Sequence, residues 1–386
     1  MFAYGIFKVI YSPFKAFKEI IQNPKYIGPI LVIIFFIVAN VGFVYVAISK
    51  TYVEQTLPTA SQLDKWTENS TLWVSNANIT KSDDFISGVY YGNKSIEFSL
   101  VNDTQIWMQL NNTEPINCSG TEGYKNMSFR IKLICPTTTK LRNASLFLYS
   151  SLADYFYYNL TKHFTPFNST IWNNLTIPTG SESGSWLSDT TEADWGNITR
   201  LRFEFTWLEN TNITVRLDGL FFRGVFRSEL KNASNYILTF SLYAVMQFTL
   251  KWIILSGIIY ILSKAFGSKT VWRPLLIVVG FVLITLFIQT VINTAAYAAL
   301  PTLYYPLEYF SSIEGEREIV YNKISEETWL VSLISNYVQI AVYIWTIALC
   351  AIALRLLAEF SWTKSFLVAA VAYFASMLAE SLLLGY

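Results

Sequence analysis

The sequence predicts an α-helical membrane protein with five transmembrane helices and an all-β sandwich inserted between the first two. Composition is the first observation: of the 386 residues, 53% are hydrophobic and only 14% are charged, unlike a soluble domain. Patterning is the second, because long apolar runs flank the segment 51–235, which is polar and built from short alternating stretches.

Charge and residue usage exclude several classes of function. The net charge of +1 provides no basic field for nucleic acid, so no nucleic-acid partner is expected. His163 is the only histidine, so a zinc site or a histidine-based catalytic triad lacks its residues. No pair of carboxylates has a spacing that identifies a hydrolytic site. We therefore expect neither an enzyme nor a cofactor.

Residues 1–25 predict an amphipathic helix in the cytoplasmic membrane interface. Ser12 followed by Pro13 is typical of a helix start. The next apolar residues share one helix face, namely Phe14, Phe17, Ile20 and Ile21. Residues 26–50 then form a first span, long enough to cross about 30 Å of hydrocarbon. Basic residues precede it, so we expect an uncleaved signal anchor with a cytoplasmic N-terminus.

Residues 51–235 predict a sandwich with linkers, whose core covers 66–226. Segments such as Lys94–Leu100, Phe129–Ile134, Leu201–Thr206 and Asn212–Asp218 alternate with period two, and Gly, Asn, Asp and Pro separate them. Many short alternating strands with polar turns are typical of a β-sandwich.

The same segment holds every Asn-x-Ser/Thr sequon of the chain, more than chance would place there. We expect N-glycosylation, and hence an extracytoplasmic location, from the acceptors Asn69, Asn78, Asn93, Asn102, Asn111, Asn117, Asn126, Asn143, Asn159, Asn168, Asn174, Asn197, Asn212 and Asn232. Cys118 and Cys135 also lie in this segment, where an oxidising environment favours a disulfide between them. The alternative is a Thr/Asn-rich β domain that holds sequons by accident.

Four further spans are expected at 236–266, 274–300, 329–360 and 365–386. Short basic loops follow the second and fourth spans, whereas the loop 301–328 is acidic. Basic loops face the cytoplasm, so this loop and the C-terminus are expected to be extracytoplasmic. We expect an integral protein of the plasma membrane, or of an endomembrane in a eukaryote.

Polar side chains inside the spans gather in the extracytoplasmic halves of the helices. They are Asn40, Gln247, Lys251, Gln289, Asn293, Asn336, Gln339 and Glu380. One interpretation is an outward-facing polar pocket in which Lys251 and Glu380 pair or hold a ligand's head group. The other is a set of interhelical hydrogen bonds that stabilise the bundle.

Part of the sandwich resembles galactose-binding-like jelly rolls. The similar segments are Gly88–Ile96, Ala153–Tyr158, Trp172–Pro178, Trp195–Phe205 and Arg216–Phe222. Several rings there are candidates for sugar stacking or for core packing: Trp172, Trp186, Trp195, Trp207, Tyr155 and Tyr157. Asp218 is either a calcium ligand or a turn aspartate before Gly219.

The membrane part resembles the Yip family, which in eukaryotes interacts with Rab GTPases of vesicle traffic. The similar residues are Ile10–Phe17, Leu262–Lys269 with Trp272–Leu275, and Trp345–Arg355 with Thr363–Phe366. This chain differs from the small eukaryotic members by the inserted sandwich and by lacking a sizeable cytoplasmic domain.

Three functions agree with these observations. The first is a non-enzymatic membrane protein whose sandwich binds a glycan or a protein outside the cytoplasm. The second is an accessory subunit of a membrane complex for glycosylation, secretion or the surface layer, with a protein partner in the membrane. The third is a carrier of small molecules or lipids that uses the polar pocket. All three place membrane lipids around the helices.

Overall fold

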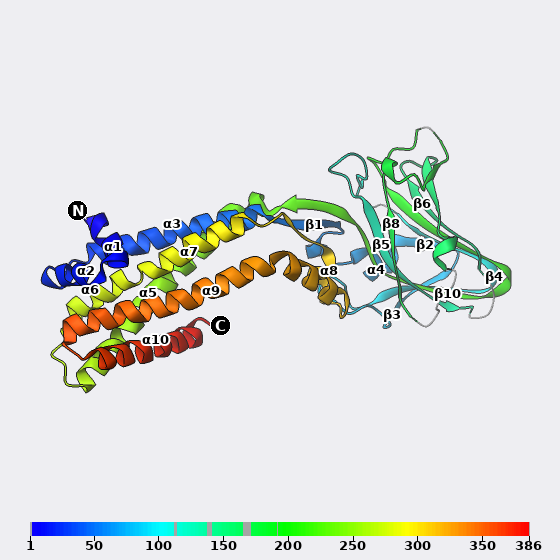
Figure 1. Cartoon of the computed structure of the whole chain (residues 1–386). Helices are drawn as coiled ribbons and strands as arrows, with labels where there is room; N and C mark the ends of the chain where they lie inside the picture. Colours follow the sequence, from blue (N-terminus) through cyan, green and yellow to red (C-terminus); the bar gives the residue numbers. More distant parts are fainter. Residues whose placement is uncertain (1, 112–113, 137–140, 165–170, 191, 386) are drawn as a thin grey trace. The chain divides into compact units, whose positions relative to one another are not determined.

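A computed structural model describes residues 2–111, 114–136, 141–164, 171–190 and 192–385. They form two compact units, each assembled from segments that are distant in the sequence (Figure 1). The helical unit contains Met1–Thr51, Ser228–Leu303 and Ile324–Tyr386, and the β unit contains Tyr52–Arg227 and Tyr304–Lys323.

Apolar helices dominate the helical unit. In chain order the α-helices are α1 (Phe2–Tyr11), α2 (Pro13–Gln22), α3 (Ile27–Ser49), α5 (Ala233–Ala265), α6 (Trp272–Val282), α7 (Ile284–Ala298), α9 (Glu316–Ala358) and α10 (Trp362–Leu384). Within the described residues, five helical segments are long and apolar enough to cross a membrane: Ile27–Ser49, Glu229–Ala265, Trp272–Ala298, Glu316–Ala358 and Trp362–Leu384. The protein is therefore a membrane protein.

The N-terminal helix begins at Pro13, as expected from the sequence, but a further helix precedes it. Phe17 of α2 is fully buried, and Phe14 meets the ring of Trp362 edge-on at a centroid distance of 5.6 Å. Lys8 of α1 pairs with Glu19 of α2 at 2.5 Å. The apolar face of α2 thus packs on other helices of its own unit.

The β unit is a sandwich with strands β1 (Thr51–Leu57), β2 (Trp73–Ser75), β3 (Asn78–Ser82), β4 (Ser95–Leu110), β5 (Asn126–Cys135), β6 (Leu141–Tyr149), β7 (Tyr155–Asn159), β8 (Asn173–Pro178), β9 (Leu187–Ser188), β10 (Arg200–Ser228) and β11 (Leu303–Tyr305). Short helices α4 (Lys65–Glu68) and α8 (Leu307–Ser311) accompany them. Inward-facing apolar residues fill the core, as where Phe129 and Phe203 meet edge-on at 4.9 Å.

One long strand, β10, connects the two halves of the sandwich. Its first part, Leu201–Thr206, lies between β4 and β6, and its second part, Ile213–Leu217, lies between β4 and β5. The sequence predicts two alternating runs here, and both belong to this single strand. The register shifts between Thr206 and Ile213, so the strand changes its neighbours without ending.

The predicted disulfide between Cys118 and Cys135 is wrong, because both cysteines are free. The Tyr124 N–H donates to the carbonyl of Asn117 at 2.8 Å, which places Cys118 near the beginning of β5. Cys135 is the last residue of that ten-residue strand, about 30 Å away at ~3.3 Å per residue. A disulfide needs Cα atoms within about 7 Å. Burial raises the pKa of the Cys118 thiol to about 12.

The β unit also includes Tyr304–Lys323, which lies between α7 and the spanning part of α9. Arg223 of β10 binds Glu54 of β1 in bidentate fashion, with Nη2 to Oε2 at 2.7 Å, and also binds Glu308 of α8 at 2.6 Å. Arg130 of β5 binds Glu316 at 2.7 Å. Two arginines of the sandwich therefore hold this segment, which the sequence identifies only as an acidic loop.

Candidate functional site

Strand alternation brings a set of half-buried rings and polar groups to one side of the sheet. In β6, Ala144, Leu146 and Leu148 are buried, so the intervening side chains point away from the core. The same alternation holds in β4, β7 and β10. The outward residues form what we call the aromatic face: Trp107, Gln109, Phe147, Tyr149, Tyr155, Tyr157, Arg202 and Glu204.

The strand register arranges part of this face in a straight row. Gln109 is paired with Arg202, Arg202 with Phe147, Phe147 with Tyr157, and Tyr157 with Leu187. These residues come from five neighbouring strands, and strands lie about 4.8 Å apart, so the row is about 19 Å long. A row of this length suits an elongated ligand better than a single small molecule.

The four rings that β6 and β7 contribute to this face contact one another. The ring centroids of Phe147 and Tyr155, Phe147 and Tyr157, and Tyr149 and Tyr155 are each 5.4 Å apart. Phe147 and Tyr149 are stacked at 6.4 Å with an interplanar angle of 30°. Such a surface offers flat apolar area at little cost in side-chain entropy, because aromatic residues have only two side-chain torsions.

Charged groups border the rings. The guanidinium carbon of Arg202 lies 4.5 Å from the centre of the Trp107 ring, and its Nη2 is 2.5 Å from Glu204 Oε1. Its Nε is buried without a hydrogen-bond partner among the described residues. Arg200 lies 4.9 Å above the ring of Tyr149. Burial is the main cause that raises the pKa of Tyr149, so this hydroxyl stays protonated at neutral pH.

A cavity lies at each end of the row. A cavity of about 300 Å³ is bordered by Phe147, Tyr155, Tyr157 and the residues Leu187–Asp189. A cavity of about 830 Å³ at the other end includes Gln109 and Arg200 in its wall. Both volumes are typical of ligand sites, which range from ~300 to ~1,000 Å³.

Only two of the rings that the sequence singles out lie on this face, Tyr155 and Tyr157. Trp195 and Trp207 are buried in the core, and Trp186 packs edge-on against Trp195 at 5.4 Å. Trp172 donates to Asp84 at 3.2 Å, away from this row. Sequence reasoning missed Trp107, Phe147 and Tyr149. Phe147 and Tyr149 could have been found from the uninterrupted apolar run Leu146–Tyr149, which indicates a strand with an apolar outer side.

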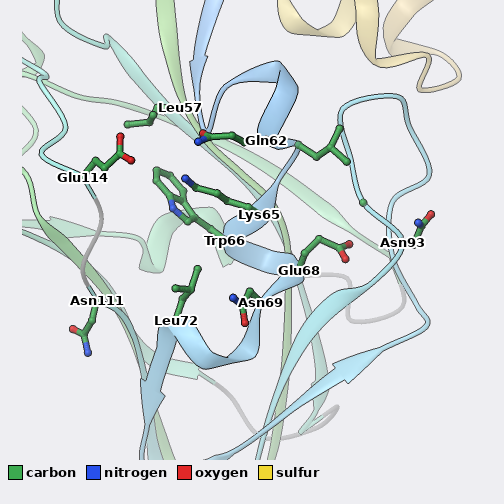
Figure 2. A pocket seen from close by; sticks show the side chains of 12 residues that line it. Leu57, Gln62, Lys65, Trp66, Glu68, Asn69, Leu72, Asn93, Asn111 and Glu114 are labelled. Carbon is green, nitrogen blue, oxygen red and sulfur yellow. The ribbon is translucent and has the colours of Figure 1, made fainter.

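Another cavity, of about 530 Å³, lies near α4 and does not offer a stacking site (Figure 2). Its indole, Trp66, is 4% exposed and meets the ring of Phe222 edge-on at 6.1 Å. Three sequon asparagines border the cavity: Asn69, Asn93 and Asn111. A glycan on any of them would narrow its entrance.

Asp218 forms the turn that precedes Gly219. Its Oδ1 accepts from the Gly219 N–H at 2.8 Å and its Oδ2 accepts from the Ile86 N–H at 2.6 Å. The neighbouring carboxyl of Asp64 accepts from the Gly92 N–H at 2.7 Å. Burial and the Asp64 carboxyl raise the pKa of Asp218 to about 8. Backbone N–H donors already satisfy both oxygens of Asp218, which favours the turn interpretation over a calcium ligand.

Most of the predicted glycan acceptors in the described residues are exposed. Among the described sequon asparagines, Asn111, Asn126 and Asn143 are half-buried and the others are exposed. Asn168 lies outside the described residues. At Asn69 the side-chain oxygen accepts from the hydroxyl of Thr71 at 2.8 Å, so acceptor and hydroxyl of that sequon already touch.

In the helical unit the structure brings Lys251 and Glu380 together. Lys251 Nζ of α5 lies 3.1 Å from Glu380 Oε2 of α10, and both side chains are buried. The ammonium also lies 5.3 Å from the centre of the Tyr373 ring, while Glu380 Oε1 has no hydrogen-bond partner among the described residues. Gln339 donates to Tyr343.

The remaining polar residues of the spans differ in burial. Asn40, Gln247, Gln289 and Asn293 are half-buried, and Asn336 is exposed on α9. The Asn293 Oδ1 atom is buried without a partner in the described part of the chain. Among the described residues, Lys251 and Glu380 are the two members of the predicted cluster that bind each other directly.

Fold and site together define a class: a helical membrane protein that carries an all-β sandwich with an aromatic outer face. Residues 205–382, from β10 to α10, match the family model of the Yip1 domain. The resemblance to the Yip family is thereby confirmed over these residues. The family is one of membrane proteins and is not known for catalysis. No curated protein matches the chain.

Among solved structures, the sandwich resembles family 11 carbohydrate-binding modules from Clostridium thermocellum. One, in complex with a β-1,3-1,4-mixed-linked tetrasaccharide, is 15% identical with a TM-score of 0.28, over 44% of this chain and 94% of that one. The module of the cellulosomal cellulase Lic26A-Cel5E is 13% identical with a TM-score of 0.26, over 40% and 89%.

Proposed function

We propose that this protein is a non-enzymatic, Yip-like membrane protein whose glycosylated sandwich binds a glycan chain outside the cytoplasm. The aromatic face is the observation that carries the proposal. It combines contiguous rings with the amide of Gln109, the guanidinium of Arg202 and the carboxylate of Glu204. Sugar rings need this pairing, because their C–H faces stack on aromatic rings while their hydroxyls bind polar groups.

Two observations support an extracytoplasmic sandwich. Every sequon lies in 51–235, and Lys264, Lys269 and Arg273 surround the loop after the second predicted span. In addition, Tyr304–Lys323 belongs to the same compact unit as Tyr52–Arg227, although two candidate spans separate the two segments. Two crossings return the chain to the side it left, in agreement with five spans, a cytoplasmic N-terminus and an extracytoplasmic C-terminus.

Glycan binding by the full-length protein in nanodiscs tests the proposal. We expect that Trp107→Ala and Tyr157→Ala each weaken binding of oligosaccharides, found on a glycan array, by about tenfold or more, as for central interface aromatics. Trp172→Ala is the matched control, because this half-buried indole lies outside the aromatic face. Equal losses from all three variants, or no binding by the wild type before and after enzymatic removal of its N-glycans, would refute the proposal.

A second function, an accessory subunit of a membrane complex, is favoured by Asn336. This amide is exposed on α9, within a segment that is apolar enough to span the membrane. A polar side chain facing lipid is unfavourable, and another helix relieves it by hydrogen bonding. Native mass spectrometry of the untagged protein from its own membranes tests this: a stable co-migrating subunit lost in Asn336→Leu supports it, and a bare monomer contradicts it.

A further inference from the structure

Two predicted glycan acceptors lie on the aromatic face itself. Asn143 of β6 and Asn159 of β7 follow the same alternation as the rings, and Asn159 is paired with Ser145 in the register that pairs Tyr157 with Phe147. Residues two apart on a strand point to the same side, about 7 Å from each other. The side chain of Asn159 therefore starts about 7 Å from that of Tyr157.

The two asparagines differ in how their amide groups are used. Asn143 is half-buried, its Nδ2 donates to Ser145 Oγ at 2.9 Å and its Oδ1 accepts from Thr161 Oγ1 at 2.9 Å. Asn159 is exposed and uses only its Oδ1, which accepts from the Thr161 N–H at 2.9 Å, in the hydrogen bonds of the described residues. The Asn159 Nδ2, which is the atom that carries an N-glycan, points to no protein acceptor there.

We propose that the N-glycan of Asn159 lies on the aromatic face of its own chain and competes there with external glycans. The inference rests on the proposed glycosylation and deepens the proposed function by naming the first occupant of the site. A sugar attached to Asn159 reaches Tyr157, Phe147 and the cavity of about 300 Å³ beside them. Its short tether gives an effective concentration in the millimolar range, which suffices to occupy a weak carbohydrate site.

The consequence is a binding site whose availability depends on its own modification. A tethered competitor lowers the fraction of open faces, and the apparent dissociation constant of an external ligand rises in inverse proportion to that fraction. Chains that lack the Asn159 glycan would hold external glycans more tightly than chains that carry it. The structure assigns no such role to Asn78, an exposed sequon asparagine on β3, whose strand pairs with Ser95–Ser99 and not with the row.

The test uses the full-length protein from a glycosylating host, as wild type, Asn159→Gln and the control Asn78→Gln. Glycopeptide mass spectrometry gives the occupancy of Asn159, and nitration by tetranitromethane reports the accessibility of Tyr155 and Tyr157, with exposed Tyr321 as the internal reference. We expect Asn159 of the wild type to carry a glycan. Nitration of Tyr157 should rise at least about twofold in Asn159→Gln and should not rise in Asn78→Gln. A twofold rise is what a face occupied half of the time would give.

An unglycosylated Asn159, or equal nitration of Tyr157 in all three proteins, would overturn the inference. Binding of an oligosaccharide to the wild type and to Asn159→Gln distinguishes a failure of this inference from a failure of the proposed function. If Asn159→Gln binds at least about twofold more tightly than wild type, both stand. If Tyr157 is unmasked but neither protein binds an external glycan, the self-occupied face stands and the proposed function fails. If both proteins bind equally and nitration is unchanged, only the proposed function stands.

Discussion

Asp64 and Asp218 share a buried corner of the sandwich, where their side chains are 0% and 1% exposed. The hydroxyl of Thr67 lies 3.0 Å from Asp64 Oδ2 and 3.4 Å from Asp218 Oδ1. Burial and the nearby Asp64 carboxyl raise the pKa of Asp218, so Asp218 keeps its proton at neutral pH. At the scale of single residues, the environment rather than the residue type decides the charge.

This proton predicts a pH dependence. The pKa of Asp218 is about 8 when folded and ~3.9 when unfolded, so its stabilising contribution is complete below about pH 4 and is lost as the pH rises through 8. Asp64→Asn removes the neighbouring charge and places an amide donor there. We expect the variant to equal the wild type near pH 5 and to exceed it in stability near pH 9.

Hydrogen exchange of the β5 peptide in full-length protein measures this difference. The control is Asp83→Asn, an exposed aspartate paired with Lys94. A stability difference between Asp64→Asn and wild type that does not change with pH would contradict the raised pKa of Asp218.

At the scale of elements, buried ion pairs join segments that are distant in the sequence. Arg223 links β10, β1 and α8, and the side chain of Glu54 is only 3% exposed. Glu54 also accepts from the N–H groups of Gly224 and Leu307, each at 2.8 Å. The arginine holds the pKa of Glu308 below its usual value against the opposing effect of burial. Arg223 therefore helps to keep the partly buried Glu308 charged.

We expect Arg223→Met to destabilise the attachment of Tyr304–Lys323 by about 3–5 kcal/mol, because removing one partner leaves two carboxylates without a cation. Limited proteolysis should then cut within this segment faster than it does in the wild type. A triple variant with Arg223→Met, Glu54→Gln and Glu308→Gln should recover part of the loss. Equal cleavage of wild type and Arg223→Met would contradict this role.

For the ion pair of Lys251 and Glu380, which joins α5 and α10, we likewise expect that removing one partner destabilises the protein more than removing both. Lys251→Met leaves a carboxylate in an apolar bundle, and an unpaired charge in a span is unfavourable by about 2.5–3.5 kcal/mol. We expect lower thermal stability in detergent for Lys251→Met and for Glu380→Gln singly, and a smaller loss for the double variant. Additive losses, which a double-mutant cycle would reveal, would indicate that the two side chains do not act as a pair.

At the scale of the whole molecule, the proposed topology assigns a side of the membrane to each loop. Two exposed positions test it in a Cys135→Ser background: Lys269, in the loop after the second span, and Glu314, within Tyr304–Lys323. We expect an impermeant maleimide to label Glu314→Cys in intact cells, and Lys269→Cys only after permeabilisation. Labelling in the reverse order would place the sandwich in the cytoplasm and remove the basis for its glycosylation.

The sequence by itself determined the apolar runs, the alternating strands and the Yip-like segments, because length, hydropathy and periodicity are local properties of a chain. It also narrowed the partner of Lys251 to Glu380, since few acids lie deep within a span. Tertiary structure decided which residues meet across strands. Phe147, Tyr157 and Arg202 become neighbours only through the register of β6, β7 and β10.

The failed disulfide has a related reason: the sequence predicts an alternating strand at Phe129–Ile134, but only the structure shows that it extends over ten residues and separates Cys118 from Cys135. The dependence of contacts on tertiary structure also explains why the acidic loop 301–328 gives no sign of joining the sandwich. That attachment depends on Arg130 and Arg223, whose carboxylate partners are up to 186 residues away along the chain. Such contacts depend on packing, which brings distant segments together only in the folded protein.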